Sequence, residues 1–344
     1  MKSKVAHFLG LVALTAAALH AQPTNGPVYW SPTQPDCSSL NENPVAITSG
    51  GKTIGYSCYV SGAFVWLAAG QNWGTTIRVA APASAPIGVN YTFYDKSGNN
   101  QNLDTTVNNV ASSLTATNQV SFALSADQPA EVELLGAAGN GPSYPIAAQG
   151  SVYAVFYCPD ATTCGNVLPQ LLYSELPTNP WLLSVPISFD QLVWTQWSAV
   201  SINGPGQFAA LVIYNEDTVA NTYKISIFDN NGNLAGTATT PSIPAGQNLG
   251  NGTYGQGGTY GVLLAQLIPT LPQGPFKILV DGGTYYSAVE VLQFNGPAAS
   301  SLQVAYDSAP AAAAGTTVAA ARRSALKASR VESLPKEVFP PAPR

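Results

Sequence analysis

Residues 227–233 form the stretch Ile-Phe-Asp-Asn-Asn-Gly-Asn, and residues 93–99 form Phe-Tyr-Asp-Lys-Ser-Gly-Asn, 134 positions earlier. In both stretches an apolar and aromatic run ends at an aspartate, with Gly and Asn close behind. Asp, Asn and Gly tolerate the left-handed backbone that a tight turn needs. The two stretches therefore predict a β-strand that enters a hairpin turn at two equivalent places in the chain.

Two further pairs of segments align at the same offset. Residues 76–79 fall on 210–213, and residues 153–155 fall on 287–289, all of them β-type runs. A repeated pattern of strand, connection, strand and hairpin turn indicates two copies of one β-unit with loops of different length.

Short apolar or β-branched runs, bounded by Gly, Pro, Asn, Asp or Ser, continue through the rest of the body. This pattern is typical of all-β sandwiches. Only 9% of the residues are charged, which excludes a coiled coil, and 46% are hydrophobic, which is enough for a sizeable core. We expect an all-β protein of two tandem antiparallel β-sandwich domains. The runs are 63–69, 75–81, 89–94, 120–124, 130–135, 152–157, 192–202, 209–214, 222–228, 259–264, 276–280 and 285–294.

Changes in composition suggest the boundaries between the parts of the chain. Four prolines between residues 166 and 190 predict a linker, and an Ala-rich, basic composition from residue 309 onward predicts a disordered or short-helical tail. The predicted parts are a signal peptide at 1–21, a first domain at 22–165, a Pro-rich linker at 166–190, a second domain at 191–308 and a tail at 309–344.

The first residues resemble a secretory signal. Lys2 and Lys4 precede an apolar run over 8–19, and cleavage after Ala18 or Ala21 is expected. The run is too short for a membrane-spanning helix, so we expect no transmembrane segment in the mature chain. We predict an exported protein of the periplasm, the cell surface or the medium.

Both histidines of the chain, His7 and His20, lie in this segment. Its removal would leave no imidazole, the commonest general base near neutral pH, and would exclude catalytic triads and His-ligated metal sites. We therefore expect no catalytic residues, no metal site and no cofactor.

The four cysteines are Cys37, Cys58, Cys158 and Cys164. An even number behind an export signal predicts disulfides. Three pairings are possible, and proximity in the sequence favours Cys37–Cys58 and Cys158–Cys164.

The charge is unevenly distributed. Acidic residues outnumber basic ones in 22–311, whereas basic residues gather in 312–344. A lysine-poor, acidic body excludes nucleic-acid binding, which needs clustered Lys and Arg. The basic tail could touch an anionic surface, but we favour a solvated terminus.

An export signal followed by β-units that each carry an aromatic-Asp-x-x-Gly-Asn turn resembles predicted secreted bacterial proteins built of tandem immunoglobulin-like sandwiches. The resemblance covers roughly residues 60–160 and 200–305. It implies a bacterial source and no catalytic residues, because such proteins mostly have no assigned chemistry. The Cys…Trp…Cys pattern of the immunoglobulin core is not evident, which leaves the strand topology open.

Candidate contact residues are aromatic. Trp194 and Trp197 are three residues apart, so on a strand one can fill the core while the other is exposed for stacking on a sugar. Tyr254 and Tyr260 belong to Gly-Thr-Tyr repeats in a Gly-rich region, which predict either a recognition loop or simply a loop and a strand start.

For three acidic residues we favour a structural interpretation over a functional one. Asp229 begins a stretch that superficially resembles a calcium loop, but its Gly is misplaced for an EF-hand and a hairpin turn explains it better. Glu131 and Glu133 alternate on one strand face, as glycosidase carboxylates could, but a solvated face is the simpler interpretation.

These observations leave three function hypotheses. The first is an exported, non-enzymatic binding or structural module. The second is a carbohydrate-binding or two-carboxylate glycoside-active protein, and the third is a subunit of an extracellular filament or adhesin. The partner is unknown, with a glycan or a protein as candidates.

Overall fold

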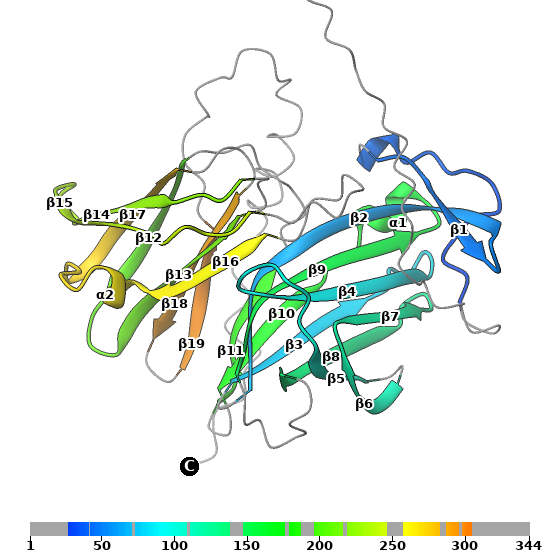
Figure 1. The fold of residues 1–344 in the computed structure, drawn as a ribbon, viewed down its shortest axis with the longest axis horizontal. Coiled ribbons are helices and arrows are strands. Elements are labelled where there is room, and N and C mark those ends of the chain that lie inside the picture. The colour runs from blue at the N-terminus through cyan, green and yellow to red at the C-terminus, as the bar shows by residue number, and fades with distance from the viewer. Residues whose placement is uncertain are drawn as a thin grey trace, which may run out of the picture. The chain divides into compact units, whose positions relative to one another are not determined.

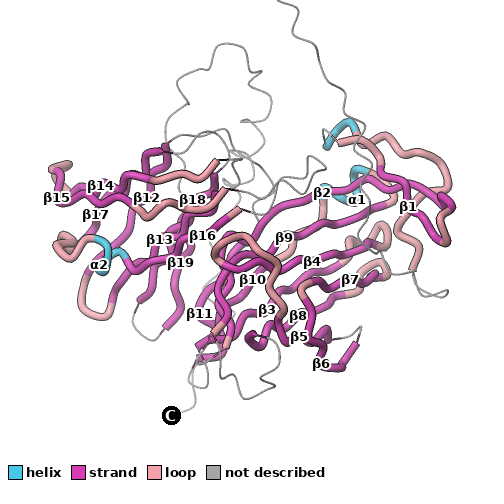
Figure 2. Tube along the Cα trace, in the orientation of Figure 1, coloured by secondary structure: helices cyan, strands magenta, loops and turns pink. Residues whose placement is uncertain are grey.

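The computed structural model of the chain describes residues 27–40, 42–70, 73–108, 111–137, 147–175, 179–186, 196–215, 219–245, 257–282, 287–295 and 298–304. In these residues strands dominate, and helix occurs only as the short segments η1 (Ser38–Leu40), α1 (Ala161–Gly165) and α2 (Leu264–Leu267) (Figure 2). The protein is all-β with antiparallel sheets, as predicted. All of these described residues belong to one compact unit. Within the described ranges no helix is long and apolar enough to cross a membrane.

Two sheets form what we call the N-terminal sheet pair (Figure 1). The first has the order β1-β2-β9-β4-β7, with β1 (Val45–Ser49), β2 (Lys52–Ala69), β9 (Ala148–Cys158), β4 (Ile87–Asp95) and β7 (Gln119–Leu124). The second has the order β11-β10-β3-β8-β5-β6, with β11 (Asn179–Pro186), β10 (Gln170–Glu175), β3 (Trp73–Ala80), β8 (Pro129–Ala137), β5 (Leu103–Asn108) and β6 (Ala111–Thr117).

Two four-stranded sheets form the C-terminal sheet pair. One has the order β12-β17-β14-β15, with β12 (Gln196–Asn203), β17 (Gly274–Gly282), β14 (Tyr223–Phe228) and β15 (Leu234–Thr239). The other has the order β16-β13-β18-β19, with β16 (Gly258–Leu263), β13 (Gln207–Asn215), β18 (Ser287–Asn295) and β19 (Ala298–Val304).

The two sheet pairs share one strand order. β2-β9-β4-β7 corresponds to β12-β17-β14-β15, and β8-β3-β10-β11 corresponds to β16-β13-β18-β19, with antiparallel pairing at every step. The strands β1, β5 and β6 have no counterpart among the strands described for the C-terminal pair. An insertion that carries β5 and β6 separates β4 from β7, whereas a short turn joins β14 to β15.

This correspondence agrees with two of the three segment pairs that the sequence aligned and corrects the third. β3 matches β13 and β4 matches β14, as the offset predicts. Residues 153–155 lie in β9, which occupies the place of β17, whereas residues 287–289 begin β18. The fixed offset fails there because the connections after β4 and β14 differ in length.

The linker prediction for residues 166–190 also needs correction. β10 and β11 lie in this segment, and β10 pairs with β3 in the six-stranded sheet. Proline removes a ladder hydrogen bond and is tolerated mainly on edge strands. Pro180 and Pro186 lie on β11, which is an edge strand, so the prolines mark the edge of a sheet.

The two aspartate turns have the same hydrogen bonds. Asp229 accepts from the backbone N–H groups of Asn231 and Asn233 at 2.9 and 2.8 Å. Asp95 accepts from those of Ser97 and Asn99 at 2.8 and 2.9 Å. Gly232 and Gly98 have φ of 82° and 80°. Each carboxylate completes its own turn, which supports the hairpin interpretation over a calcium loop.

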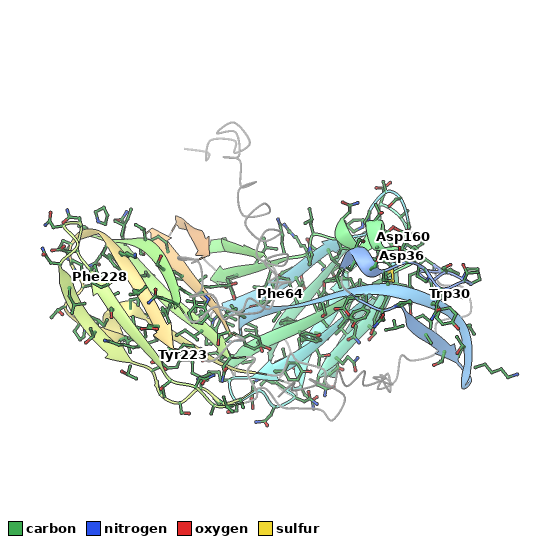
Figure 3. The ribbon with its side chains drawn as sticks, turned by 90° about the horizontal axis from the view of Figure 1, so that it is seen from above. Trp30, Asp36, Phe64, Asp160, Tyr223 and Phe228 are labelled. Atoms are coloured by element: carbon green, nitrogen blue, oxygen red, sulfur yellow. A yellow bond between two sulfur atoms is a disulfide. The ribbon has the colours of Figure 1, made fainter. Side chains whose placement is uncertain are left out.

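Each sheet pair has its own apolar core. Phe64, Tyr91 and Phe156 are buried between the sheets of the N-terminal pair, and Trp197 and Tyr223 lie in the core of the C-terminal pair (Figure 3). These sandwich-like cores explain the alternating sequence pattern, because successive strand residues point to opposite faces.

The disulfides are Cys37–Cys58 and Cys158–Cys164, the pairing that proximity favoured. Cys58 lies directly opposite Cys158 in the β2–β9 register, so both bonds meet at one point of the sheet. Asp36 and Asp160, next to these bonds in the sequence, lie at the same end of the N-terminal sheet pair (Figure 3). The predicted signal peptide and tail lie outside the described residues.

Tyr91 offers a test of the N-terminal core. Its hydroxyl is buried and has no hydrogen-bond partner among the described residues, whereas the buried Tyr223 hydroxyl bonds to Ser287. An unsatisfied buried hydroxyl costs free energy, so Tyr91→Phe should raise the free energy of unfolding by about 1 kcal/mol. Tyr223→Phe, the matched control, should lower it by a similar amount. Urea denaturation of both variants measures the difference, and a loss of stability in Tyr91→Phe would contradict the expectation.

Candidate functional site

Trp197, predicted as a contact for a sugar or a protein partner, lies in the C-terminal core. Only 2% of the residue is exposed, and its ring centroid lies 6.1 Å from that of Tyr223. Alternation along β12 puts Ala199 inside with Trp197 and exposes Val200. A buried ring cannot stack on a ligand, so the prediction for Trp197 is wrong. Trp194 lies outside the described residues.

The Gly-Thr-Tyr repeats give a similar result. Gly258, Thr259 and Tyr260 begin β16, which agrees with the strand-start alternative. Tyr260 is half-buried against the C-terminal core, and burial raises the pKa of its hydroxyl. Tyr254 lies outside the described residues.

Glu131 and Glu133 share one face of β8, as predicted. Glu131 pairs with Nε of Arg78 at 2.6 Å, and Glu133 accepts from Thr106 and Asn108 at 3.0 and 3.3 Å. These bonds use both carboxylates to join β8 to its neighbours β3 and β5. The pair is a structural feature of a half-exposed sheet face.

Aromatic and polar side chains that could bind a ligand lie together on the outer face of the five-stranded sheet. Tyr153 and Tyr157 on β9 point away from the core, because Val152, Ala154 and Phe156 fill it. The sheet register places Tyr59 of β2 directly opposite Tyr157. On the other side of β9, Asn90 of β4 lies opposite Val155.

Amide groups extend this surface across β4 to β7. Gln119 donates from Nε2 to Oδ1 of Asn90 at 3.0 Å. We call the surface formed by Tyr59, Tyr153, Tyr157, Asn90 and Gln119 the tyrosine face. It is half-buried, so its rings and amides are partly open to solvent.

The segment before β1 borders the tyrosine face and supplies its carboxylate. Glu42 accepts a hydrogen bond from the Tyr59 hydroxyl at 2.5 Å. Tyr29 lies over Gly88, and its ring centroid is 6.4 Å from that of Tyr157. The Cys37–Cys58 disulfide ties this segment to β2.

The ionisable groups of the tyrosine face act on one another. Burial, followed by the hydrogen bond to Glu42 and the nearby Tyr153 and Tyr157, raises the pKa of Tyr59. Burial and the neighbours Tyr153 and Tyr29 raise the pKa of Tyr157 to about 12. Burial also raises the pKa of Glu42, although the hydrogen bond from Tyr59 opposes this shift. The phenols of Tyr59 and Tyr157 therefore stay neutral at physiological pH and act as hydrogen-bonding groups.

The tyrosine face is suited to binding a ligand through non-covalent contacts. Its rings offer apolar surfaces, its hydroxyls donate and accept, and its amides and Glu42 offer further polar atoms. None of its five residues is basic, and a phenol with a raised pKa is a poor general base. In the described part of the chain, no group of three or more His, Cys, Asp or Glu is placed to hold a metal ion.

Sequence reasoning missed the tyrosine face. Tyr153, Val155 and Tyr157 occupy alternate positions of a strand, a pattern that places two tyrosines on one side. That signal was available, but the partner Tyr59 is almost a hundred residues away, and only the sheet register brings it beside them.

Comparison of the chain with protein-family models, with curated proteins and with solved structures gives no match. The case for a function therefore depends on the geometry of the chain itself.

Proposed function

We propose that the chain is an exported, non-enzymatic binding module that contacts its ligand through the tyrosine face. The observation that carries this proposal is the gathering of Tyr59, Tyr153 and Tyr157, with Glu42, on one outer sheet face. Outward tyrosines without a nucleophile–base pair favour recognition over catalysis. Contact residues of this type recur in binding sites because they combine apolar area with a polar tip.

Several features support the export and non-enzymatic parts of the proposal. Two disulfides suggest an oxidising compartment. The predicted leader contains both histidines, so its removal would take away the commonest catalytic base. The shared strand order of the two sheet pairs supports an arrangement of tandem sandwich domains.

The proposal includes a likeness to immunoglobulin domains in the two-layer arrangement of the sheets. In immunoglobulin domains the first strand lies beside the second. Here the first strand of the C-terminal pair, β12, lies beside β17 instead. The proposed relationship is therefore one of two-layer architecture with a different connectivity.

A neutral carbohydrate is the ligand class that the face favours. Sugar rings stack on aromatic side chains, and their hydroxyl groups pair with amides, phenols and carboxylates. The Asn90–Gln119 pair and Glu42 supply those partners, whereas the lack of basic residues on the face disfavours anionic ligands. An extended sheet face suits a chain of sugar units that lies across several strands.

The test is binding of the purified mature chain to a panel of neutral oligosaccharides, with Tyr153→Ala as the test variant. Loss of one stacking ring should weaken binding by about tenfold or more. Phe208→Ala is the matched control, because Phe208 is also a strand aromatic, is 41% exposed and lies on β13. Thermal unfolding checks that both variants are folded.

Weaker binding in Tyr153→Ala alone would support the proposal. An equal loss in both variants would contradict it, and so would the absence of binding to any oligosaccharide in the panel.

A further inference from the structure

Glu290 is an acidic residue whose carboxyl group is buried among apolar residues. It lies on β18, where Val289 and Val291 point into the C-terminal core, so Glu290 belongs to the opposite face of the strand. An acidic residue on the outer face of a sheet normally reaches solvent. Glu290 is only 4% exposed.

The outer face of the sheet β16-β13-β18-β19 is covered by the N-terminal sheet pair. Val212, Tyr214 and Leu292 of this face belong to the N-terminal core. We call the surface at which the two sheet pairs meet the seam.

Hydrogen bonds and a close contact fix the seam along β16. Thr259 donates from Oγ1 to the carbonyl of Val65 at 2.8 Å and from its backbone N–H to the carbonyl of Lys96 at 3.0 Å. The ring of Trp66 lies so close to Gly261 that an added Cβ would be 2.7 Å away. The two sheet pairs therefore touch through backbone as well as side chains.

Among the residues that the structure describes, no Lys or Arg forms an ion pair with Glu290. Its Oε2 has no hydrogen-bond partner among the described residues. Tyr173 of β10 is near enough to interact electrostatically, but its hydroxyl donates to the carbonyl of Trp66. Tyr214 of β13 accepts from Gly257, and the side chain of Lys96 is exposed.

The other strands at the seam bring no countercharge. β11, β12, β16 and β19 contain no Lys, Arg, Asp or Glu in their sequences. On β2, the residues at the seam are Val65 and Trp66. Among the described residues, Tyr173 interacts electrostatically with Glu290, and burial raises the pKa of its phenol. β10 also carries Glu175, an acidic residue that brings no countercharge.

We propose that Glu290 makes the seam a proton-dependent joint, closed while the carboxyl is protonated and loosened when it ionises. A neutral carboxyl tolerates an apolar seam, whereas a buried carboxylate without a partner is strongly disfavoured and draws in water. Loosening of the seam hydrates the charge and leaves the core of each sheet pair intact.

The pH range follows from the burial. Burial raises the pKa of Glu290 from its usual value of 4.5 to about 8. Between these two values the folded protein holds a proton that the unfolded chain has released. The closed seam therefore loses stability relative to the open seam as the pH rises from about 4.5 to about 8, the range over which the Glu290 proton is lost on opening.

The backbone N–H of Thr259 reports on the seam, because it bonds to Lys96 across it. The N–H of Thr240 bonds to Tyr223 within the C-terminal pair and is the internal reference. Hydrogen exchange of both amides, followed by NMR at pH 6 to 9 and expressed as protection factors, separates opening of the seam from global unfolding.

In the wild type we expect the protection factor of Thr259 to fall at least tenfold between pH 6 and 9, while that of Thr240 stays constant. Glu290→Gln should remove the fall. Glu133→Gln, which changes a half-exposed glutamate, should behave as the wild type does.

A constant wild-type protection factor at Thr259 would overturn the proposal whether or not the Gln variant folds. Equal falls at Thr259 and Thr240, or a fall that persists in Glu290→Gln, would overturn it as well. The experiment needs no ligand, so its outcome is independent of the proposed binding function.

Discussion

Replacing Cys37 and Cys58 together by serine should lower the free energy of unfolding by about 3 kcal/mol, as expected for a crosslink that closes a loop of this length. The same change should release the segment that carries Tyr29 and Glu42. That segment borders the tyrosine face, and the disulfide crosslinks it to β2. Urea denaturation measures the first effect, and loss of the ring contact between Tyr29 and Tyr157 in NMR spectra reports the second.

The double variant of Cys158 and Cys164 is the matched control. That bond closes a loop of only six residues and should contribute about 2 kcal/mol. It joins α1 to the end of β9 and does not crosslink the segment that carries Tyr29 and Glu42, so the Tyr29–Tyr157 contact should persist. If the control disturbs this contact as much as the Cys37–Cys58 variant does, the first disulfide has no special role in shaping the tyrosine face.

Gly150→Ala should destabilise the N-terminal sheet pair by about 3 kcal/mol or more. Gly150 lies on β9 where β4 passes close by, and an added Cβ would lie 1.8 Å from the carbonyl oxygen of Tyr94. Backbone cannot move aside as a flexible side chain can, so the clash must separate the two strands. Because β9 carries Tyr153 and Tyr157, the variant should also disturb the tyrosine face.

Gly165→Ala is the control for this substitution. A Cβ at Gly165, at the end of α1, would meet nothing within 4 Å, so the change should stay within about 0.5 kcal/mol. Urea denaturation of both variants gives the comparison. Equal stability of Gly150→Ala and the wild type would contradict the close approach of β4 to β9 at Gly150.

Local features of this fold could be predicted from the sequence. The aspartate turns depend on side chains that bond to their own backbone, so Asp95 and Asp229 could be assigned without knowledge of the sheets. The disulfides each close a short loop, so proximity was sufficient. Strand alternation also predicted correctly that Glu131 and Glu133 share a face.

Features that depend on strand pairing could not be predicted in this way. The segment of β10 and β11 resembles a linker because β11 contains two prolines, which an edge strand tolerates, and the edge is defined by the sheet order. The sequence allows Trp197 to lie either in the core or on the surface, and only the packing of β12 shows that it lies in the core. Glu290 follows the alternation of an ordinary half-exposed strand, and its burial arises because a second sheet pair covers that face.

The tyrosine face also depends on strand pairing. The alternate spacing of Tyr153 and Tyr157 indicates a shared side, but Tyr59 and Glu42 join them through the β2–β9 register and the Cys37–Cys58 bond. The aromatic residues that the sequence singled out, by contrast, lie between residues 194 and 260.

The most direct test of the binding account is an NMR titration of the protein, labelled with 13C in its tyrosine rings, with a neutral oligosaccharide series. The account predicts saturable shifts of Tyr59, Tyr153 and Tyr157, with the sugar left intact throughout the measurement. Shifts confined to tyrosines elsewhere, such as Tyr260, would contradict it. So would unchanged spectra across the series, or the appearance of new reducing-end signals from cleavage of the sugar.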